Sequence, residues 1–389
     1  MKKIALASIR AQNLKQIFDV IVKEGPTTRG RLAQATNLSL MTVSNVVENM
    51  INNDIIAVRS KKSAIGAGRK AELVDVVQDA HALLVLDLTE REFSHVVLGL
   101  NGKTLFETQP IPTDIAVDYK KSLQRYLEKV AEEIRERGYE KKLVGVGVAA
   151  PGPYQVDTDT VYTQLIPELN EIRLKALINE TLGDEVMVYI DEDVKYAARA
   201  NLSMVENAME KTLAYVYIGE GVGGAFLVNG RILMGAHSMA GEVSRMLIGD
   251  GGRRAGTLSR PHFLQKLGIE HQSDWLTEVL KIKASDESKI SAALDEIAVD
   301  LAELCYGLCW LVDPHQIILE CDYVRMLDEN FTDKVQQLLA ERLQGVSPHA
   351  PKVSMTYQGL RYAYRGAAMV LTEKWLENLA SSRASLLEE

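Results

Sequence analysis

A glycine-rich stretch in the middle of the chain is the first candidate for chemistry. Residues 213–246 begin with an apolar strand pattern, and four glycines follow within six residues: Gly219, Gly221, Gly223 and Gly224. Such density lets backbone N–H groups approach an anion, or lets another strand approach closely. The stretch turns at Asn229-Gly230 and ends near Glu242. It is therefore a candidate phosphate-binding loop or a site of close backbone packing.

Small polar side chains on one predicted helix near the N-terminus form a second candidate group. Ser39 is a suitable N-cap for a helix over residues 40–52. Its apolar positions, expected to face the core, are Leu40, Val43, Val46 or Val47, Met50 and Ile51. Hydroxyls and amides on the first turns can approach base edges, and helix N-termini can contact phosphate. The residues predicted to contact DNA here are Ser39, Thr42, Ser44 and Asn45.

Two further helices are predicted before this one. In residues 13–24 the apolar side chains recur at helical spacing, and they are Leu14, Ile17, Phe18, Ile21 and Val22. Gly25-Pro26 ends that helix, and Thr28 can cap a second helix that ends at Thr36. Helices joined by a tight turn, the last with polar first turns, predict a helix-turn-helix.

A basic hairpin is predicted after the third helix. Two alternating apolar runs, 55–58 and 73–77, flank a loop that is rich in glycine and basic residues. This is typical of a wing whose tip follows phosphates or enters a minor groove. The alternative is a generic three-helix domain with a solvated loop. The loop residues predicted to contact DNA are Lys61, Lys62, Gly68, Arg69 and Lys70.

The charge distribution supports the DNA-binding interpretation. The whole chain of 389 residues has a net charge of −9. Residues 1–70 contain 12 Lys/Arg and 4 Asp/Glu, whereas the rest contains 32 and 49. A basic module on an acidic body is the asymmetry expected when only one part of a protein binds nucleic acid.

Composition indicates a cytoplasmic protein with more than one domain. Apolar residues make up 47% of the chain, and no apolar run approaches the roughly 18 residues of a membrane span. The apolar patch before Arg10 is too short for a signal peptide. The odd number of cysteines, in apolar context, predicts reduced core residues rather than disulfides or a metal-ligand pair: Cys305, Cys309 and Cys321.

From residue 82 onward, strands alternate with helices. Strands are expected at 82–88, 93–100, 143–150, 185–193, 316–320 and 353–357. Helices are expected at 117–137, 171–182, 194–202, 261–280, 286–312, 329–343 and 364–378. Strand meander, helix, strand, helix occurs twice in this order, which predicts two related α/β lobes with a cleft between them.

Several ordered motifs resemble the ROK family of sugar kinases and repressors, and specifically its regulators with an N-terminal winged helix-turn-helix. The motifs are GVGVAAPGP, YIDEDVKYAA, IGEGVGGAFLVNGRILMGAHSMAGEVSRM, LVDPHQIILE and YRGAAMV. The resemblance implies an α/β fold with an actin-like, ribonuclease H-like body of two lobes. The expected domains are 1–78 for DNA binding, 79–198 with about 366–389 for lobe 1, and 199–365 for lobe 2, which senses ligand and dimerises.

Departures from the family pattern argue against ATP use. Family kinases have an Asp-x-Gly-x-Thr turn that admits nucleotide phosphate, whereas Asp87 here is followed by Leu88, Thr89 and Glu90. In the glycine-rich stretch, Glu220 replaces a Thr or small residue. A carboxylate beside bound triphosphate is repulsive by roughly 1 kcal/mol or more. We therefore expect no enzymatic activity and no bound cofactor.

The sugar site is only half retained. Asp193 matches the kinases' general base and Glu242 the family's sugar-contacting Glu, but Glu192 and Lys195 replace Asn residues. Lys195 can pair with a neighbouring acid or bind an anionic sugar derivative; an ion-paired site without ligand is the alternative. The ligand-contacting residues implied by the resemblance are Asp193, Glu242, Glu192, Lys195, Arg245 and Gly152.

The family's zinc site is not expected. Arg245 stands where the family has a ligating His, and the loop after it contains no cysteine. His237 and His262 are interpreted as isolated structural or surface residues. Three arginines replace the metal loop with charge and can pair with acids, bind ligand or remain solvated: Arg253, Arg254 and Arg260.

We therefore expect a transcriptional regulator, a repressor of carbohydrate-metabolism genes, that binds operator DNA as a homodimer or homotetramer. Its effector would be a carbohydrate or sugar phosphate, and no membrane contact is expected. One alternative is an active sugar kinase with an added DNA-binding domain. A second is a regulator whose body is only a dimerisation or protein-docking scaffold.

Overall fold

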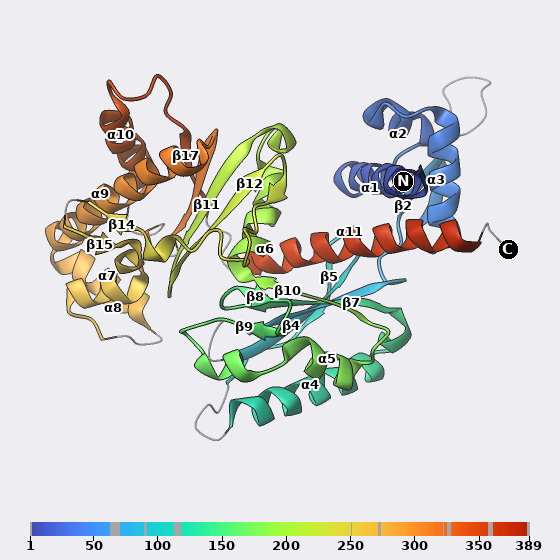
Figure 1. The fold of residues 1–389 in the computed structure, drawn as a ribbon, viewed down its shortest axis with the longest axis horizontal. Coiled ribbons are helices and arrows are strands. Elements are labelled where there is room, and N and C mark those ends of the chain that lie inside the picture. Colours follow the sequence, from blue (N-terminus) through green and yellow to red (C-terminus); the bar gives the residue numbers. More distant parts are fainter. Residues whose placement is uncertain are drawn as a thin grey trace. The chain divides into compact units, whose positions relative to one another are not determined.

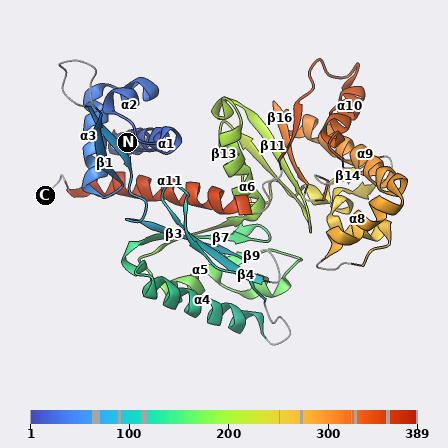
Figure 2. The same cartoon turned by 180° about the vertical axis from the view of Figure 1, so that it is seen from behind.

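The computed structural model describes residues 2–62, 71–88, 92–112, 118–249, 251–270, 274–321, 323–324, 328–356 and 361–386. The chain forms two compact units, Met1–Asp193 with Ala367–Glu389 and Val194–Gly366. Figures 1 and 2 show the elements of each unit from opposite sides. The predicted domain boundary at 198/199 falls inside helix α6 (Asp193–Asn201). None of the described helices combines the length and the apolar character needed to cross a lipid bilayer.

The N-terminal elements are three helices followed by an antiparallel hairpin, as predicted: α1 (Lys2–Glu24), α2 (Arg29–Thr36), α3 (Leu40–Asn52), β1 (Ile56–Lys62) and β2 (Ala71–Val76). The hairpin strands are longer than the apolar runs that predicted them. Helix α1 begins earlier than residue 13, and its buried side chains include Leu14, Ile17, Phe18 and Ile21. The hairpin is joined to the helices by the Thr27–Val74 bridge, so these five elements pack together.

Helix starts follow from the capping residues. The Thr28 hydroxyl accepts a hydrogen bond from Arg31 N, and the Ser39 hydroxyl accepts one from Thr42 N. Between α2 and α3, Asn37 adopts φ 56°, a left-handed conformation that Asn tolerates better than most residues. The predicted caps and the tight turn of the helix-turn-helix are therefore confirmed.

Two residues predicted to face this core are exposed instead. Leu40 is 57% exposed and Val22 is 41% exposed. Leu40 is the first residue of α3, and the buried stripe of that helix begins only at Val43 and continues through Val47 and Met50. Helical periodicity assigns a face correctly in the middle of a helix, but it fails at a terminal turn that has no neighbouring turn to pack with.

The two α/β sheets have the same topology. The first has strand order β10-β7-β3-β4-β5, with β6 also pairing with β4, and the second has order β13-β12-β11-β16-β17. In each sheet three strands are parallel and the other two main strands continue it antiparallel. This confirms the predicted repetition of one α/β arrangement along the chain.

The first sheet consists of β3 (Ala82–Asp87), β4 (Glu92–Gly99), β5 (Thr104–Glu107), β6 (Ile111–Pro112), β7 (Leu143–Ala150) and β10 (Met187–Glu192). Helices α4 (Tyr119–Glu136) and α5 (Leu174–Leu182) cover one face and share its core. Helix α11 (Arg361–Leu386) covers the other face at β7, where Cβ atoms on Gly145 and Gly147 would lie 3.3 and 3.2 Å from Leu371. Figure 2 shows α4 and α11 on opposite sides of these strands.

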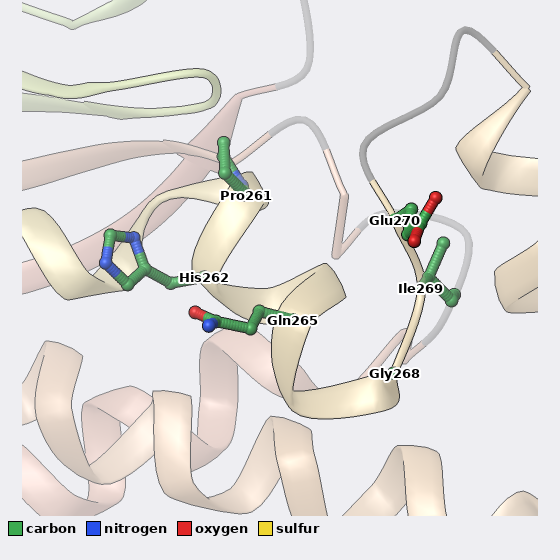
Figure 3. Close-up of a pocket in the computed structure, with 6 residues that line it drawn as sticks. All are labelled: Pro261, His262, Gln265, Gly268, Ile269 and Glu270. Carbon is green, nitrogen blue, oxygen red and sulfur yellow. The ribbon is translucent and has the colours of Figure 1, made fainter.

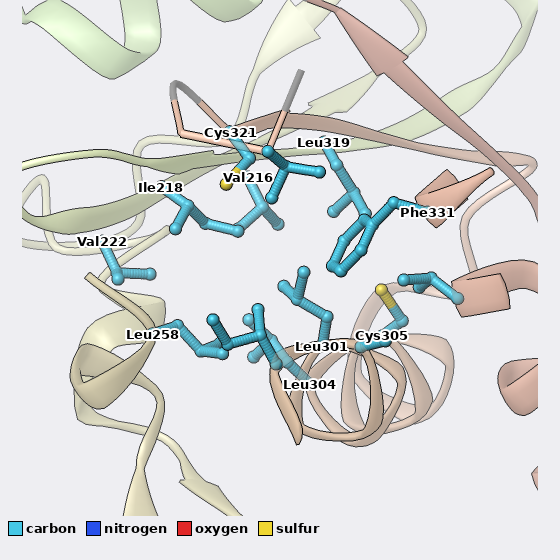
Figure 4. Packing of buried hydrophobic residues seen from close by; sticks show 14 of the residues in the cluster. Val216, Ile218, Val222, Leu258, Leu301, Leu304, Cys305, Leu319, Cys321 and Phe331 are labelled. Atoms are coloured by element: carbon cyan, nitrogen blue, oxygen red, sulfur yellow. The ribbon is translucent and has the colours of Figure 1, made fainter. Parts of the chain in front are cut away.

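The second sheet consists of β11 (Thr212–Ile218), β12 (Val222–Val228), β13 (Arg231–Ile232), β16 (Gln316–Cys321) and β17 (Lys352–Thr356). Helices α7 (Arg260–Leu267), α9 (Glu287–Val312) and α10 (Phe331–Leu343) contribute to its main core. Figure 4 shows Cys305 and Cys321 among the aliphatic side chains of that core. Burial raises the pKa of the Cys305 thiol to about 12. The prediction of buried core thiols is confirmed for these two, whereas Cys309 is half-buried.

The helix predicted over 261–280 is wrong, because the chain forms two helices there, α7 and α8 (Trp275–Ser285). Gly268 ends α7 with φ 77°, the left-handed conformation of a C-cap glycine. The short strands β8 (Tyr154–Gln155), β9 (Thr160–Val161), β14 (Leu247–Ile248) and β15 (Arg253–Arg254) form two small hairpins outside the main sheets.

Helix α11 begins against helix α6 with no space for a side chain. A Cβ on Gly366 would lie 1.8 Å from the carbonyl oxygen of Tyr196 in α6. Glycine at this position therefore allows two helix backbones to touch, and it fixes the position of α6 within the second unit.

Substituting Gly366 with Ala should reverse the usual effect of that change. In a helix, Gly→Ala normally stabilises by up to about 1 kcal/mol. Here the added methyl overlaps the Tyr196 carbonyl, so we expect a loss of about 1–3 kcal/mol in unfolding free energy, measured by urea denaturation. Gly30→Ala in α2 is the control, because the atom nearest to its added Cβ, Thr28 Oγ1, would be 4.0 Å away. Equal or greater stability of Gly366→Ala would contradict the close contact.

Candidate functional site

The first turn of α6 is joined to the loop between β13 and the short 3-10 helix at Val243–Arg245 by a buried ammonium group. Lys195 is 1% exposed, and its Nζ donates a 2.8 Å hydrogen bond to the carbonyl oxygen of Ser238. Ser238 has φ 57°, an unusual conformation for a residue other than glycine. A buried charge needs such an acceptor, so helix and loop hold each other in place.

Helix α6 begins at Asp193, directly after β10 ends at Glu192. Asp193 is half-buried, whereas Glu192 is 6% exposed. In the parallel pairing of β10 with β7, Glu192 lies opposite Ala150. The predicted general-base position is thus the first residue of the helix that Lys195 fixes. Carboxylates are favoured there by the helix N-terminus.

The loop after Ser238 carries the second predicted carboxylate, Glu242. Its side chain is 28% exposed, and its Oε2 lies 3.9 Å from Nε of Arg245. That separation is too long for a hydrogen bond, so the pair is a loose, partly solvated ion pair. Arg245 is therefore a cation beside the acid predicted to contact sugar.

Close backbone packing requires glycine at two places in this region. A Cβ on Gly241 would lie 2.1 Å from the Gly224 carbonyl oxygen, so the loop and strand β12 are in backbone contact. A Cβ on Gly152 would lie 2.3 Å from the Tyr162 carbonyl oxygen. Of the two interpretations of the glycine-rich stretch, close packing is observed at Gly224, and ligand contact by Gly152 stays a prediction.

The turn between β11 and β12 is occupied by side chains of the protein itself. Arg260 forms an ion pair with Glu220, and the Arg260 guanidinium also lies 5.0 Å from the centre of the Trp275 ring. Arg260 N donates to the Gly219 carbonyl at 2.7 Å, and the Tyr217 hydroxyl lies where a side chain on Gly219 would project. Arg260 therefore pairs with an acid, one of the alternatives left open by the sequence, and its charge offsets that of Glu220.

The remaining arginines of this region are also accounted for. Arg253 donates a 2.5 Å hydrogen bond to Asp300, so it pairs with an acid, one of the three alternatives left open by the sequence. Arg254 is exposed. Among the described residues, no three His, Cys, Asp or Glu side chains come together as a metal-ligand group.

The predicted DNA-contacting side chains of α3 fall into two sets. Ser39 and Thr42 belong to the N-cap, where their hydroxyl oxygens are 2.9 Å apart. Ser44 is half-buried and Asn45 is exposed. Side chains of Lys61 and Lys62 on the hairpin, and all of Gly68, Arg69 and Lys70, lie outside the described residues, as do Thr89 and Glu90 of the first phosphate turn.

Two surface hollows lie away from the predicted ligand residues. One of 480 Å³ is formed by α7 and the residues that follow it, with His262 at its edge (Figure 3). The other, of 700 Å³, lies beside α4 and includes His95 and Glu133. Neither includes a residue that the sequence assigned to ligand.

Family comparison gives a match over most of the body. The model of the ROK family matches residues 84–374, about three quarters of the chain. The chain belongs to the ROK family.

Related ROK proteins include both regulators and kinases. A xylose repressor of Caldicellulosiruptor bescii is 24% identical over 60% of this chain and 57% of its own length. The regulator NagC of Escherichia coli is 20% identical over 63% and 60%. A glucokinase of Halalkalibacterium halodurans is 32% identical over 27% and 32%. The chain thus spans less than two thirds of the length of each of these relatives.

Solved ROK structures show the same fold. A ROK family transcriptional regulator, described as a homolog of the E. coli MLC protein, superposes with a TM-score of 0.72 over 97% of this chain and 99% of that one, at 16% identity. A ROK hexokinase from Thermus thermophilus superposes with a TM-score of 0.59 over 74% and 97%, at 19% identity. The superposition on that regulator therefore includes the N-terminal helices of this chain as well as its ROK body.

Sequence reasoning missed two contacts of this ROK body. The Lys195–Ser238 hydrogen bond and the Glu220–Arg260 ion pair join residues 43 and 40 positions apart. The unusual residue types at Lys195 and Glu220 were the available signals, but spacing alone does not reveal their distant partners.

A buried histidine, His95, lies in the first unit, and its protonation is expected to make the stability of that unit depend on pH. Its ring is 3% exposed, with Nδ1 2.9 Å from the Tyr126 hydroxyl and 3.1 Å from the Thr108 hydroxyl. Nε2 lies 3.4 Å from Glu133 Oε2. Burial lowers the pKa of the His95 ring below its usual value, although the Glu133 carboxylate opposes that change.

Acid should therefore weaken the fold through His95. A lowered folded-state pKa means that the unfolded chain binds the proton first, so the stabilisation from neutral His95 is complete above about pH 6.5 and declines as the pH falls. The difference in unfolding free energy between wild type and His95→Gln should shrink from pH 7.5 toward pH 5, as measured by urea denaturation. His237→Gln, at an exposed ring, is the control. A difference that grows with acidity would contradict a lowered pKa.

Proposed function

We propose that this ROK protein is a DNA-binding transcriptional regulator that responds to a carbohydrate or sugar-derived ligand. The observation that carries the proposal is that one chain combines a capped helix α3, with an exposed polar residue, and a ROK body whose β11–β12 turn carries the Glu220–Arg260 ion pair. The names of the xylose repressor and NagC support it.

Ligand is proposed to bind at the first turn of α6 and the loop after Ser238. Asp193 and Glu242 supply carboxylates that accept hydrogen bonds from sugar hydroxyls. Lys195, at 1% exposure and bound to the Ser238 carbonyl, is not placed to receive an anionic ligand. Arg245, whose side chain is 46% exposed, is the cation that remains for a sugar phosphate.

The filled turn favours a regulator over a kinase. In a phosphate-binding turn, backbone N–H groups and cations must face the nucleotide. Here the Arg260 cation is already paired with Glu220 and lies over the Trp275 ring. Nucleotide binding would have to displace that pair, which supports loss of ATP use.

Coupling of DNA and sugar tests this function. Full-length protein should enrich a two-fold-symmetric site from a random duplex library, and one member of a panel of sugars, sugar phosphates and sugar acids should change its affinity for that site, measured by fluorescence anisotropy. Asp193→Asn and Glu242→Gln should abolish the sugar response and leave affinity without sugar unchanged. Glu206→Gln, at an exposed acid in the second unit, is the matched control.

Other outcomes would select the alternatives. Enrichment of no DNA sequence would overturn the proposed function. Sugar-dependent ATP consumption that Asp193→Asn abolishes would establish a sugar kinase. DNA binding without any sugar response, unchanged by Asp193→Asn or Glu242→Gln, would leave the body as a dimerisation or docking scaffold.

An exposed apolar surface on α9 is the proposed dimer contact. Its members are Val299 (46% exposed), Trp310 (54%) and Leu311 (65%). Strand β14, whose Leu247 is 68% exposed, contacts α9. The Trp310 ring packs edge-on against Tyr306, with 5.7 Å between ring centres. Helix-turn-helix proteins bind two half-sites as dimers, which gives a second copy of this chain as the partner.

Substituting Trp310 with Glu should weaken self-association. A buried interface Trp contributes about 2 kcal/mol or more, so the dimer dissociation constant should rise roughly tenfold or more in sedimentation equilibrium. Val156→Glu is the control, since Val156 is 75% exposed in the first unit. Unchanged association of Trp310→Glu, or equal weakening by Val156→Glu, would rule out the α9 surface.

A further inference from the structure

Met41 is the most exposed large apolar side chain in the described part of the molecule, at 77%. It is the second residue of α3, directly after the exposed Leu40. The buried stripe of the same helix, Val43, Val47 and Met50, is filled without it. Met41 therefore contributes nothing to the core, and its exposure needs another explanation.

Met41 shares a face of α3 with polar residues. Ser44, Asn45 and Glu48 follow at three, four and seven positions, the spacings that place side chains on one side of a helix. Asn45 and Glu48 are both exposed. This outward face therefore presents an apolar group in its first turn and an amide in its second.

The N-cap sets which side chains of the first turn are available. Ser39 accepts a hydrogen bond from Thr42 N at 3.1 Å, and the two hydroxyl oxygens are 2.9 Å apart. The Thr42 hydroxyl is thus engaged within the helix start, which weakens its assignment to base edges. Met41 is the outward side chain beside it.

The acidic residue on this face is paired. Arg29 of α2 lies 3.7 Å from Glu48 and 2.9 Å from Glu72 of β2. A carboxylate near DNA repels phosphate, and the guanidinium reduces that repulsion. Because one guanidinium is shared by two carboxylates, attraction to a polyanion comes from the basic excess of residues 1–70 as a whole.

We infer that Met41 reads thymine in the major groove, by packing its thioether against the C5-methyl group. That methyl is the apolar feature among the base edges of the major groove, and a flexible thioether adapts to it. Asn45, about 6 Å further along the helix, is placed to read a base pair about two steps away. The inference rests on the proposed DNA binding and specifies which bases the half-site must contain.

Deoxyuridine substitution isolates the methyl group. In the duplex selected by full-length protein, each thymine is replaced in turn by deoxyuridine, which pairs identically but lacks the methyl. Wild type should lose about fourfold in affinity per half-site at one symmetry-related pair of positions, as expected for one buried methyl. Met41→Ala should bind the thymine duplex with a similar loss and be insensitive to deoxyuridine at those positions.

Two further variants complete the experiment. Met41→Leu retains an apolar side chain and should keep the deoxyuridine sensitivity. Met209→Ala, at a methionine 66% exposed in the second unit, should behave as wild type. If wild type binds its selected duplex equally well with every deoxyuridine, or Met41→Ala keeps the full sensitivity, the inference is wrong while DNA binding stands. If no duplex is enriched, the proposed function fails and the inference fails with it.

Discussion

A buried ammonium group joins two segments of the ROK body that the chain brings together from 43 positions apart. Lys195 is 1% exposed, and a charge at that depth is stable only with an acceptor. The acceptor is the Ser238 carbonyl, in a residue with φ 57°. Since this contact ties helix to loop, moving one without the other would break the hydrogen bond of a buried charge. In the proposed sensing site, keeping or breaking this contact would give two discrete arrangements rather than a gradual change.

Close backbone packing is the second constraint on the same region. Gly241 meets the Gly224 carbonyl, and Gly366 meets the Tyr196 carbonyl of α6. The glycine-rich stretch was open to two interpretations from sequence, an anion site or a packing site. The structure has packing at Gly224. At the turn before it, the Tyr217 side chain occupies the space beside Gly219, and Glu220 forms an ion pair with Arg260. The fold is shared with ROK kinases of known structure, and the turn between β11 and β12 carries an internal ion pair.

Local signals predicted most of the fold because they act over a few residues. The caps at Thr28 and Ser39 and the alternating strands of both sheets depend on neighbours in sequence. The prediction that Leu40 faces the core was wrong because a terminal turn has no next turn to pack with. The single helix predicted over 261–280 was wrong because Gly268 adopts a left-handed conformation, which a glycine in the sequence allows but does not require. Partners of Lys195, Glu220 and Arg253 were out of reach, since an ion pair across 40 positions leaves no periodic trace.

The N-cap of α3 links stability to recognition. A hydroxyl that caps a helix is fixed by the helix, so it is poorly placed to report on the base beside it. Ser39 and Thr42 are joined in this way, and the proposed contact of the first turn with DNA then depends on its apolar side chain. Leaving Met41 77% exposed has a solvation cost in the free protein. Binding to a thymine methyl removes that cost only at matching sequences, so an exposed apolar residue at this position discriminates between sequences where a charged residue would only add general affinity.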